Sequence, residues 1–374
     1  MRNPGIGETP SGMRVHIGFF GKTNSGKSTL VNALSSQDVS IVSSEPGTTT
    51  DPVHKAIEIL PIGPCILIDT PGLEDETTLG SARMERTMRE AAVCDIAVFV
   101  RAGSSDELSK TESELIEFFR IKNIPVVTIA GDDRDDIEAV KASIIAAARS
   151  VPERTILDGA VAEGDLVMLV MPQDKQAPKG RLILPQVATL RELLDVHART
   201  MCVAPEEMES ALSVLRESPK LIITDSQVFD YVYERKPKES ALTSFSVLFA
   251  ALKGDIEAYV AGAKAIDALK PGARILIAES CSHAPLDEDI GRVKIPGLIK
   301  KRIGGDITVD VAAGKDFPED LSGYDLILQC GGCMVNRRQI LERIEKARKQ
   351  GVPITNYGIA IAYIKGILEK VLDN

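Results

Sequence analysis

A glycine-rich stretch near the amino terminus, GKTNSGKS at residues 21–28, has the spacing of a phosphate-binding loop. It fits the pattern G-x-x-x-x-G-K-[ST], follows a predicted strand and opens a predicted helix, which is the setting that this motif requires. Gly21 and Gly26 let backbone N–H groups wrap the phosphates. Lys27 reaches the β- and γ-phosphates, and Ser28 can ligate Mg²⁺. The other polar residues of the predicted nucleotide-binding set are Ser25 and Thr29.

Two further stretches support this nucleotide site. DTPG at 69–72 follows a predicted strand, so Asp69 would hold the shell of a bound Mg²⁺ ion and the Gly72 N–H would sense the γ-phosphate. A chance glycine-rich turn would not explain this second motif. PGTTTD at 46–51 offers Thr49, which can close over Mg²⁺ in the triphosphate state and let go after hydrolysis. An ordinary polar loop is the other interpretation of these threonines.

A second candidate site involves cysteines near the end of the chain, where QCGGC occupies residues 329–333. Such a pair can close a disulfide, serve as a redox pair or hold a metal, but a thioredoxin-like pair belongs to a helix start early in a βαβ pattern. Upstream, CSH at 281–283 also follows a predicted strand, and the carboxyl ends of parallel strands share one edge. This convergence favours a metal site whose ligands are Cys281, His283, Cys330 and Cys333. Three thiolates and one imidazole suit Zn²⁺ or a 4Fe–4S cluster with one exchangeable corner, and spacing does not decide between them.

The composition bounds the class of protein. The chain has 374 residues, 44% of them hydrophobic and 26% charged, which is typical of a globular protein of two or three domains. Its net charge of −10 argues against nucleic acid as the main partner, and KKR at 300–302 is interpreted as a solvated helix end. No apolar run reaches the roughly 18 residues of a membrane span, and the first residues lack the apolar core of a signal peptide. We therefore predict a cytoplasmic protein with reduced thiols and no membrane partner, in which Cys65, Cys94 and Cys202 are plain core residues.

Alternating predicted strands and helices indicate an α/β fold in several domains. Residues 1–13 are predicted to be a flexible leader. Residues 14–152 are predicted to form a P-loop GTPase domain, a doubly wound, mainly parallel sheet that is truncated at its end. Residues 153–218 are predicted to be a small α+β middle domain whose strands could pair across a dimer. Residues 219–374 are predicted to be a parallel α/β domain that carries the metal cluster.

GKTNSGKST, GTTTD and DTPG together resemble the small GTPase domains of the bacterial Era and tRNA-modification type. The resemblance implies a cation-assisted GTPase that is slow by itself, in which Asn24 helps to bind an activating K⁺. It also places Leu73 where Ras-like proteins carry a water-orienting Gln. The predicted catalytic residues are then Asn24, Lys27, Thr49 and Gly72.

The chain departs from these GTPases where they read guanine with N-K-x-D. After the fifth predicted strand it has TIAGDD at 128–133, so only Asp132 or Asp133 could take the place of the Asp; we place Asp133 in the nucleotide-binding set. Residues 134–151 then fit one helix, with no room for the usual further strand. Each lost charge-assisted hydrogen bond is worth about 1.5–3 kcal/mol. We therefore predict that phosphate and Mg²⁺ binding are kept while the preference for guanine is weakened.

The whole-chain combination of a P-loop GTPase, a middle module with GDLVMLVMPQDKQAPKGRLILPQ and a C-terminal C-x-H…C-x-x-C domain resembles the FeFe-hydrogenase maturation GTPases, the HydF family. TDSQVF at 224–229 and PITNYGIAIAY at 353–363 add to the resemblance. It implies a 4Fe–4S cluster on the four predicted ligands, and a scaffold that hosts the diiron precursor of the hydrogenase cluster as cargo. One departure is Gln329, where many members carry His, so His283, a water or another group must fill the fourth corner.

The same resemblance implies partners. These are the apo FeFe-hydrogenase, two radical-SAM maturases whose contacts GTP turnover regulates, and further copies of the chain as a dimer or larger assembly. Apolar strands predicted at 166–171 and 182–184 fit dimerisation, and edge pairing within one chain is the competing account. The chain has no C-x-x-x-C-x-x-C and is not itself a radical-SAM enzyme. Two alternatives stay open: a GTPase for tRNA modification or ribosome assembly, and a zinc-stabilised nucleotide switch without a cluster.

Overall fold

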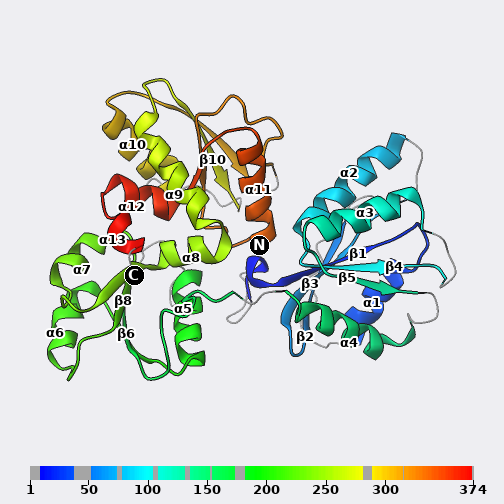
Figure 1. Cartoon of the computed structure of the whole chain (residues 1–374), viewed down its shortest axis with the longest axis horizontal. Helices are drawn as coiled ribbons and strands as arrows, with labels where there is room; N and C mark the ends of the chain where they lie inside the picture. Colours follow the sequence, from blue (N-terminus) through cyan, green and yellow to red (C-terminus); the bar gives the residue numbers. More distant parts are fainter. Residues whose placement is uncertain are drawn as a thin grey trace. The chain divides into compact units, whose positions relative to one another are not determined.

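The protein forms two compact units, the first built on one mainly parallel sheet and the second on two parallel sheets (Figure 1). Unit 1 comprises Met1–Glu153 with Met334–Glu342, and unit 2 comprises Arg154–Cys333 with Arg343–Asn374. The predicted α/β fold class is confirmed. The computed structural model describes residues 9–37, 52–73, 78–103, 108–130, 135–151, 154–172, 182–280, 289–314 and 316–372.

Unit 1 contains a five-stranded sheet in the order β2-β3-β1-β4-β5. Its strands are β1 (Val15–Phe20), β2 (Val53–Ile59), β3 (Gly63–Asp69), β4 (Ile96–Val100) and β5 (Val126–Ile129). All neighbouring strands are parallel except β2 and β3. Phe19 of β1 is in register with Asp69 of β3, so the loops that follow these strands leave from the same edge of the sheet.

Helices cover both faces of this sheet (Figure 1). α1 (Lys27–Gln37) and α4 (Ile137–Ala148) pack on one face, and α2 (Thr78–Val93) and α3 (Lys110–Ile121) pack on the other. As predicted, one helix follows β5, and no further strand lies in the described part of unit 1. The end of the leader is less simple than predicted, because Ser11–Met13 form a 3-10 turn.

The first sheet of unit 2 has four strands in the order β7-β6-β8-β9, all parallel. They are β6 (Leu166–Val170), β7 (Arg199–Val203), β8 (Leu221–Thr224) and β9 (Ala241–Ser244). The predicted α+β character of the middle module is therefore wrong, since a fully parallel sheet with intervening helices is an α/β layer. β8 was expected to open the last domain, but it pairs with β6, so this sheet continues beyond residue 218.

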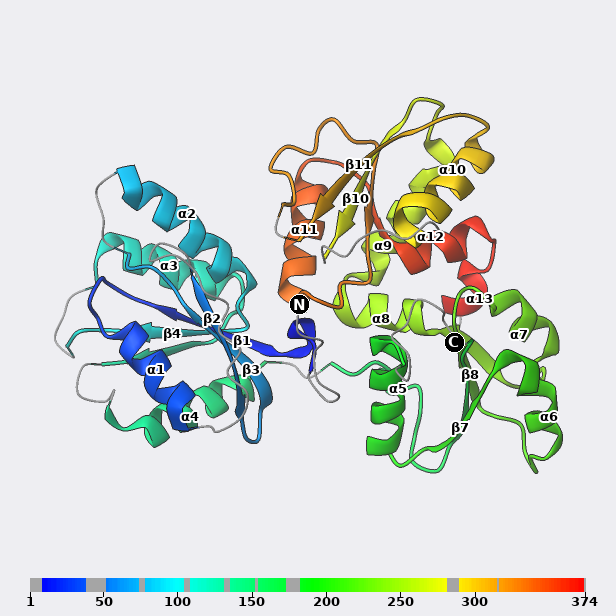
Figure 2. The same ribbon diagram turned by 180° about the vertical axis from the view of Figure 1, so that it is seen from behind.

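Helices lie on both sides of this sheet (Figures 1 and 2); the first three connect its strands and the last follows β9. They are α5 (Leu184–Asp195), α6 (Met208–Ser213), α7 (Phe229–Arg235) and α8 (Phe245–Lys253). The strand predicted at 166–171 is confirmed as β6, but the one predicted at 182–184 is wrong because α5 begins there. Pro185 stands in the first turn of α5, where the N–H that proline lacks is not needed.

The second sheet of unit 2 has the order β11-β10-β12-β13, again all parallel. Its strands are β10 (Arg274–Glu279), β11 (Thr308–Ala313), β12 (Leu326–Gln329) and β13 (Ile354–Asn356). Its helices are α9 (Ile256–Lys264), α10 (Ile295–Ile303), α11 (Arg337–Lys349) and α12 (Tyr357–Ile364), whereas α13 (Leu368–Leu372) packs against β9 of the first sheet. α10 and α12 lie on one side of the sheet and α11 on the other (Figure 2). The runs ILIA and LIL are apolar throughout because these parts of β10 and β12 are covered on both faces.

Two composition-based expectations have structural counterparts. Lys300, Lys301 and Arg302 form the last turn of α10, and Lys300 and Arg302 pair with Asp306 and Asp267. The basic run is therefore the end of a helix, as predicted, where cations also interact favourably with the helix dipole. Within the described ranges, no helix is both long and apolar enough to cross a lipid bilayer.

Candidate functional site

The glycine-rich loop predicted to bind phosphate connects β1 to α1, as its motif requires. Gly21 has φ of 143°, and a Cβ placed on it would lie 2.2 Å from the carbonyl oxygen of Val100. Asn24 and Gly26 also have positive φ, 60° and 94°. Such a backbone turns successive N–H groups toward one point, and this concavity is what binds phosphate in loops of this kind.

Lys27 lies inside this loop and is only 6% exposed. Its Nζ donates hydrogen bonds to the carbonyl oxygens of Gly21 (3.0 Å) and Lys22 (2.7 Å). Burial lowers the pKa of this ammonium, while the nearby carboxylates of Asp69 and Glu112 act in the opposite direction. A buried cation whose hydrogen bonds all go to neutral oxygens is prepared to accept an anion.

Ser28 and Asp69 meet beside the loop. The Ser28 hydroxyl donates to Asp69 Oδ2 over 2.6 Å. The other carboxylate oxygen, Oδ1, is buried, and in the part of the chain that the structure describes it has no hydrogen-bond partner. Hydroxyl and carboxylate oxygens are the ligands that Mg²⁺ prefers, so these two residues fit the predicted ion.

The DTPG segment packs tightly against the glycine-rich loop. A Cβ on Gly72 would lie 2.2 Å from Thr23 Oγ1 and 2.7 Å from its Cα, so only glycine fits this position without a shift of the loop. The next residue, Leu73, donates its backbone N–H to the Gly21 carbonyl over 3.2 Å. Its side chain is buried in the core cluster that contains Phe20.

The predicted site is only partly within the described residues. Ser28, Thr29 and Asn24 are exposed on the loop or on the first turn of α1, where a ligand can reach them. The remaining predicted residues lie outside the described ranges: Thr49, Asp132, Asp133, Cys281 and His283.

The cysteine edge, which we define as the residues around Cys330 at the carboxyl ends of β10 and β12, lies in unit 2. β10 and β12 are adjacent, with Ala278 in register with Gln329. Cys330 directly follows β12, and its Sγ lies 3.1 Å from the backbone nitrogen of Ser280 and 3.2 Å from Ser280 Oγ. Ser280 follows β10 and precedes Cys281 in the sequence. The predicted meeting of these two strand ends is therefore confirmed.

Within the described residues neither Cys330 nor Cys333 forms a disulfide, and both are partly exposed. Gly332 between them has φ of 69°, which lets the chain turn tightly within C-x-x-C. Two adjacent soft sulfur donors fit either an iron–sulfur cluster or Zn²⁺. Among the described residues, no three His, Cys, Asp or Glu side chains gather to hold a metal, since the other two predicted ligands lie outside them.

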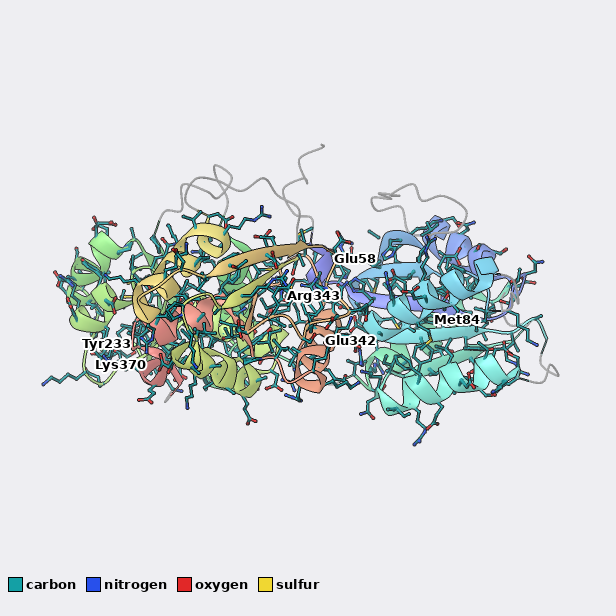
Figure 3. All side chains as sticks on the ribbon, turned by 90° about the horizontal axis from the view of Figure 1, so that it is seen from above. Glu58, Met84, Tyr233, Glu342, Arg343 and Lys370 are labelled. Atoms are coloured by element: carbon teal, nitrogen blue, oxygen red, sulfur yellow. The ribbon has the colours of Figure 1, made fainter. Side chains whose placement is uncertain are left out.

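The sequence analysis did not predict the hydrogen bond between Gln329 and Arg343 at this edge. Gln329 is fully buried, and its side-chain oxygen accepts a hydrogen bond from Nη1 of Arg343 over 3.0 Å. Arg343 lies on α11 and is 6% exposed (Figure 3). A signal for Arg343 was present, because it shares the buried side of α11 with Ile340, Ile344 and Ala347.

Polar groups on the other flank of the edge are arranged around Glu279. Both of its carboxylate oxygens accept from Arg292, over 3.0 and 2.6 Å. The Tyr357 hydroxyl is buried without a hydrogen-bond partner in the described part of the chain, and burial raises its pKa well above the ordinary value. The edge thus combines thiols, a carboxylate and a neutral phenol. Both oxygens of the Glu279 carboxylate are already hydrogen-bonded to Arg292.

The remaining cysteines behave differently from one another. Burial raises the pKa of Cys65 to about 12 and that of Cys94 further, so both thiols stay protonated and inert, as predicted for core residues. Cys202 does not lie in the core. It is exposed on β7, an edge strand of its sheet, and the prediction of a core position is wrong for it.

Three protein-family models match successive parts of the chain. The 50S ribosome-binding GTPase model matches residues 16–131. The hydrogen maturase F dimerization domain matches residues 156–254, and the hydrogen maturase F tetramerization domain matches residues 257–374. Together the two hydrogen maturase F models cover more than half of the chain. Dimerization and tetramerization domains support the predicted self-association.

Curated relatives match mainly the GTPase part. The tRNA modification GTPase MnmE of Thermotoga petrophila is 39% identical over 119 residues, which is 30% of this chain and 26% of the relative. MnmE of Chlorobium chlorochromatii is 27% identical over 241 residues, 58% of this chain and 50% of the relative. The chain therefore spans only about a quarter to a half of the length of these relatives.

Solved structures of GTPases are also similar to the chain. The G domain of the Thermotoga maritima iron transporter FeoB matches with a TM-score of 0.25 and 20% identity, covering 36% of this chain and 99% of that one. Era of Aquifex aeolicus bound to GDP·AlF4⁻ matches with a TM-score of 0.25 and 16% identity, covering 91% and 99%.

Proposed function

We propose that this chain, which belongs to the hydrogen maturase F family, is a nucleotide-regulated scaffold that binds a 4Fe–4S cluster and carries the diiron precursor of FeFe-hydrogenase. The observation that carries this proposal is the contact between Ser280 and Cys330. It joins the two strand ends from which all four predicted cluster ligands follow in the sequence. Ligands from distant stretches can bind one cluster only if the fold brings those stretches together.

The nucleotide half of the proposal rests on unit 1. Lys27 would exchange its two carbonyl partners for phosphate oxygens, and Ser28 with Asp69 would hold Mg²⁺. When bound, Mg²⁺ neutralises charge that develops on the transferred phosphate. Gly72 would present its N–H to the γ-phosphate, Thr49 would close over the ion, and Asn24 would help to bind K⁺. The predicted activity is slow GTP hydrolysis.

The cluster half rests on unit 2. Cys330 and Cys333 would supply two cluster ligands, with Cys281 as the third and His283 as the candidate for the fourth. The described thiols fit by donor chemistry, and a cluster held by three cysteines keeps one iron open to an incoming ligand. The proposed partners are the apo-hydrogenase and the two radical-SAM maturases, and the proposed cargo is the diiron precursor.

The test is iron and sulfide analysis of protein purified anaerobically. We expect wild type to hold about four iron and four sulfide ions per chain, and Cys330→Ala to lose most of both. Cys202→Ala is the matched control, because it also removes a partly accessible thiol but from another sheet. Binding of Mg²⁺–nucleotide should be the same in all three proteins. Wild type that contains zinc and no iron would instead support the nucleotide switch without a cluster.

A GTPase for tRNA modification is the second candidate, since the curated relatives are of that kind. Filter binding with total RNA separates the two, and we expect no tight complex from a chain with a net charge of −10. Base selectivity is a separate question within either function. Competition between GTP and ATP should show a reduced preference for GTP, and exclusive GTP binding would contradict the predicted weakening.

A further inference from the structure

Arg343 is a buried cation at the cysteine edge that lacks an anionic partner. Its Nη1 donates to Gln329 Oε1 over 3.0 Å and its Nη2 donates to the carbonyl oxygen of Gly314 over 2.5 Å. The ring of Phe317 lies 5.1 Å from its Cζ. In the described part of the chain no carboxylate pairs with it. Burying a charge is unfavourable unless an opposite charge compensates it, so this arrangement calls for an explanation.

The hydrogen bond from Arg343 fixes which way Gln329 faces. Because its oxygen is taken, the amide nitrogen of Gln329 is directed to the other side. There Nε2 lies 3.6 Å from Cys330 Sγ and 3.3 Å from the Cys330 carbonyl oxygen. Gln329 therefore offers an N–H donor to the sulfur and is not positioned as an oxygen ligand for a metal.

The sulfur of Cys330 thus has donors on more than one side. The backbone N–H of Ser280 points at it over 3.1 Å, and the Gln329 amide is the second donor. The thiol of Cys330 itself donates to the Ser280 hydroxyl oxygen over 3.2 Å. Donors of this kind stabilise negative charge on a sulfur atom. The charge of Arg343 lies immediately behind this shell, one hydrogen bond away through Gln329.

The same signature occurs at the phosphate loop, where the ligand class is known from the motif. Lys27 is also 6% exposed and also donates only to neutral oxygens. In a phosphate loop such a cation balances the charge of the bound anion. By the same physical reasoning, the uncompensated charge of Arg343 is balanced when an anionic sulfur group forms at Cys330.

We propose that Arg343, acting through Gln329, is a positioning residue that holds a hydrogen-bond donor and a positive charge against the sulfur of Cys330, and thereby raises the reduction potential of the cluster bound there. The inference rests on the proposed function. Hydrogen bonds to the sulfurs and the local net charge are among the determinants of cluster potentials. Reduction adds one electron from an external donor such as dithionite, so the more negative state gains most from a nearby cation. No bond of the protein is made or broken in this step.

The experiment compares wild type with Arg343→Met, which keeps an unbranched apolar stem while removing the charge and the donors. Arg343→Lys retains the charge. Arg348→Met is the matched control, because Arg348 lies on the same helix but is exposed and paired with Asp255. Each protein is loaded anaerobically with iron and sulfide and titrated with dithionite at fixed potentials, with the reduced cluster counted by electron paramagnetic resonance.

We expect the reduction equilibrium of Arg343→Met to shift at least tenfold toward the oxidised cluster, which for one electron is about 59 mV to lower potential. Arg343→Lys should recover part of the shift, and Arg348→Met should titrate as wild type does. Gln329→Leu, which removes the amide donor but leaves Arg343 in place, should shift in the same direction by less. If Arg343→Met does not fold, judged by loss of its melting transition, Gln329→Leu decides the outcome.

Two results would overturn the inference. One is a cluster in Arg343→Met or Gln329→Leu with the wild-type potential. The other is an equal loss of iron and of melting temperature in the Met and Lys variants of Arg343, which would make its role structural. Either result leaves the scaffold function intact as long as wild type holds the cluster. A wild-type protein without iron would remove both the function and this inference.

Discussion

The phosphate loop and the cysteine edge each contain a buried cation that, among the described residues, is hydrogen-bonded only to neutral oxygens, but they hold it in different ways. Both lie at the carboxyl ends of parallel strands, where ligands collect in α/β sheets. Both hold a cation that is 6% exposed and bonded to neutral oxygens. Lys27 stands in a glycine-rich loop and bonds to the carbonyl groups of that same loop. Arg343 stands on a helix and bonds to a fully buried Gln329 and to the carbonyl of Gly314, far away in sequence.

This difference fits the two kinds of anion that the proposed function assigns to these sites. A lysine with rotatable donors on a flexible stem can leave loop carbonyls for a phosphate and return when the phosphate departs. An arginine held by its planar fork between two fixed oxygens has no such freedom. Under the proposed function, this difference predicts an exchangeable ligand at the loop and a resident group at the cysteine edge.

The largest effect should come from removing the exchangeable cation. Lys27→Met should weaken Mg²⁺–nucleotide binding by on the order of a hundredfold or more, because at least two charge-assisted hydrogen bonds of about 1.5–3 kcal/mol each are lost. Fluorescent nucleotide titration measures this loss. Lys110→Met is the control, since Lys110 is exposed on α3 in the same unit.

Iron content in the same variants tests whether the phosphate loop and the cysteine edge bind their ligands independently. The comparison predicts that Lys27→Met retains as much iron and sulfide as wild type. Loss of the cluster together with nucleotide binding would break the distinction between an exchangeable and a resident anion site.

A smaller effect is expected at Gly72, whose substitution tests whether the DTPG segment senses the γ-phosphate. Gly72→Ala would place a Cβ within 2.2 Å of Thr23 Oγ1 and 2.7 Å of its Cα, so the loop or the DTPG segment must shift. Overpacking of this kind costs about 1–3 kcal/mol. We expect affinity for the triphosphate to fall roughly tenfold, with a smaller change for the diphosphate.

Isothermal titration with GDP and a non-hydrolysable GTP analogue distinguishes these two effects. Gly297→Ala is the matched control, because a Cβ there meets no atom within 4 Å. Equal weakening of both nucleotides would mean that Gly72 supports the loop in general and does not report the γ-phosphate.

The phosphate loop and the DTPG segment could be predicted from the sequence because each is a short contiguous motif. GKTNSGKS fixes the loop, and DTPG stands at the end of the strand that pairs with β1. The meeting of Ser280 and Cys330 could also be predicted, since both follow apolar runs typical of parallel strands. Each of these predictions depends on a short local pattern and one general rule about sheet edges.

What could not be predicted depends on pairings between distant segments. β8 reads as a strand in the sequence, but only the fold shows that it joins β6 and not β10. Arg343 shares one face of α11 with apolar residues, but because the helix is rich in charged residues, only the fold shows that this arginine is buried with them. Cys202 looks like a core residue because its neighbours are apolar, yet it is exposed because β7 is an edge strand.

The smallest predicted effect concerns His16 at the amino end of β1, the opposite end of the strand from the phosphate loop. Burial lowers its pKa below 6.5, although Asp95, the Arg14 carbonyl and Glu90 act to raise it, and His54 also lowers it. The folded state therefore keeps His16 neutral at pH values where the unfolded chain already binds a proton. The stability that this provides is present above about pH 6.5 and is lost as the pH falls through the lower folded-state value.

Urea unfolding of unit 1 between pH 7.5 and 5.5 measures this contribution. One such group changes the free energy of unfolding by at most about 1.4 kcal/mol per pH unit. We expect His16→Gln to flatten the decline in the urea midpoint, since the other titrating groups stay the same in both proteins. Nucleotide affinity at pH 7.5 should not change in this variant, because His16 is at the far end of β1 from Gly21. If the variant lost nucleotide affinity at pH 7.5, the two ends of β1 would be coupled. Nucleotide binding would then depend on more than the phosphate loop and the DTPG segment.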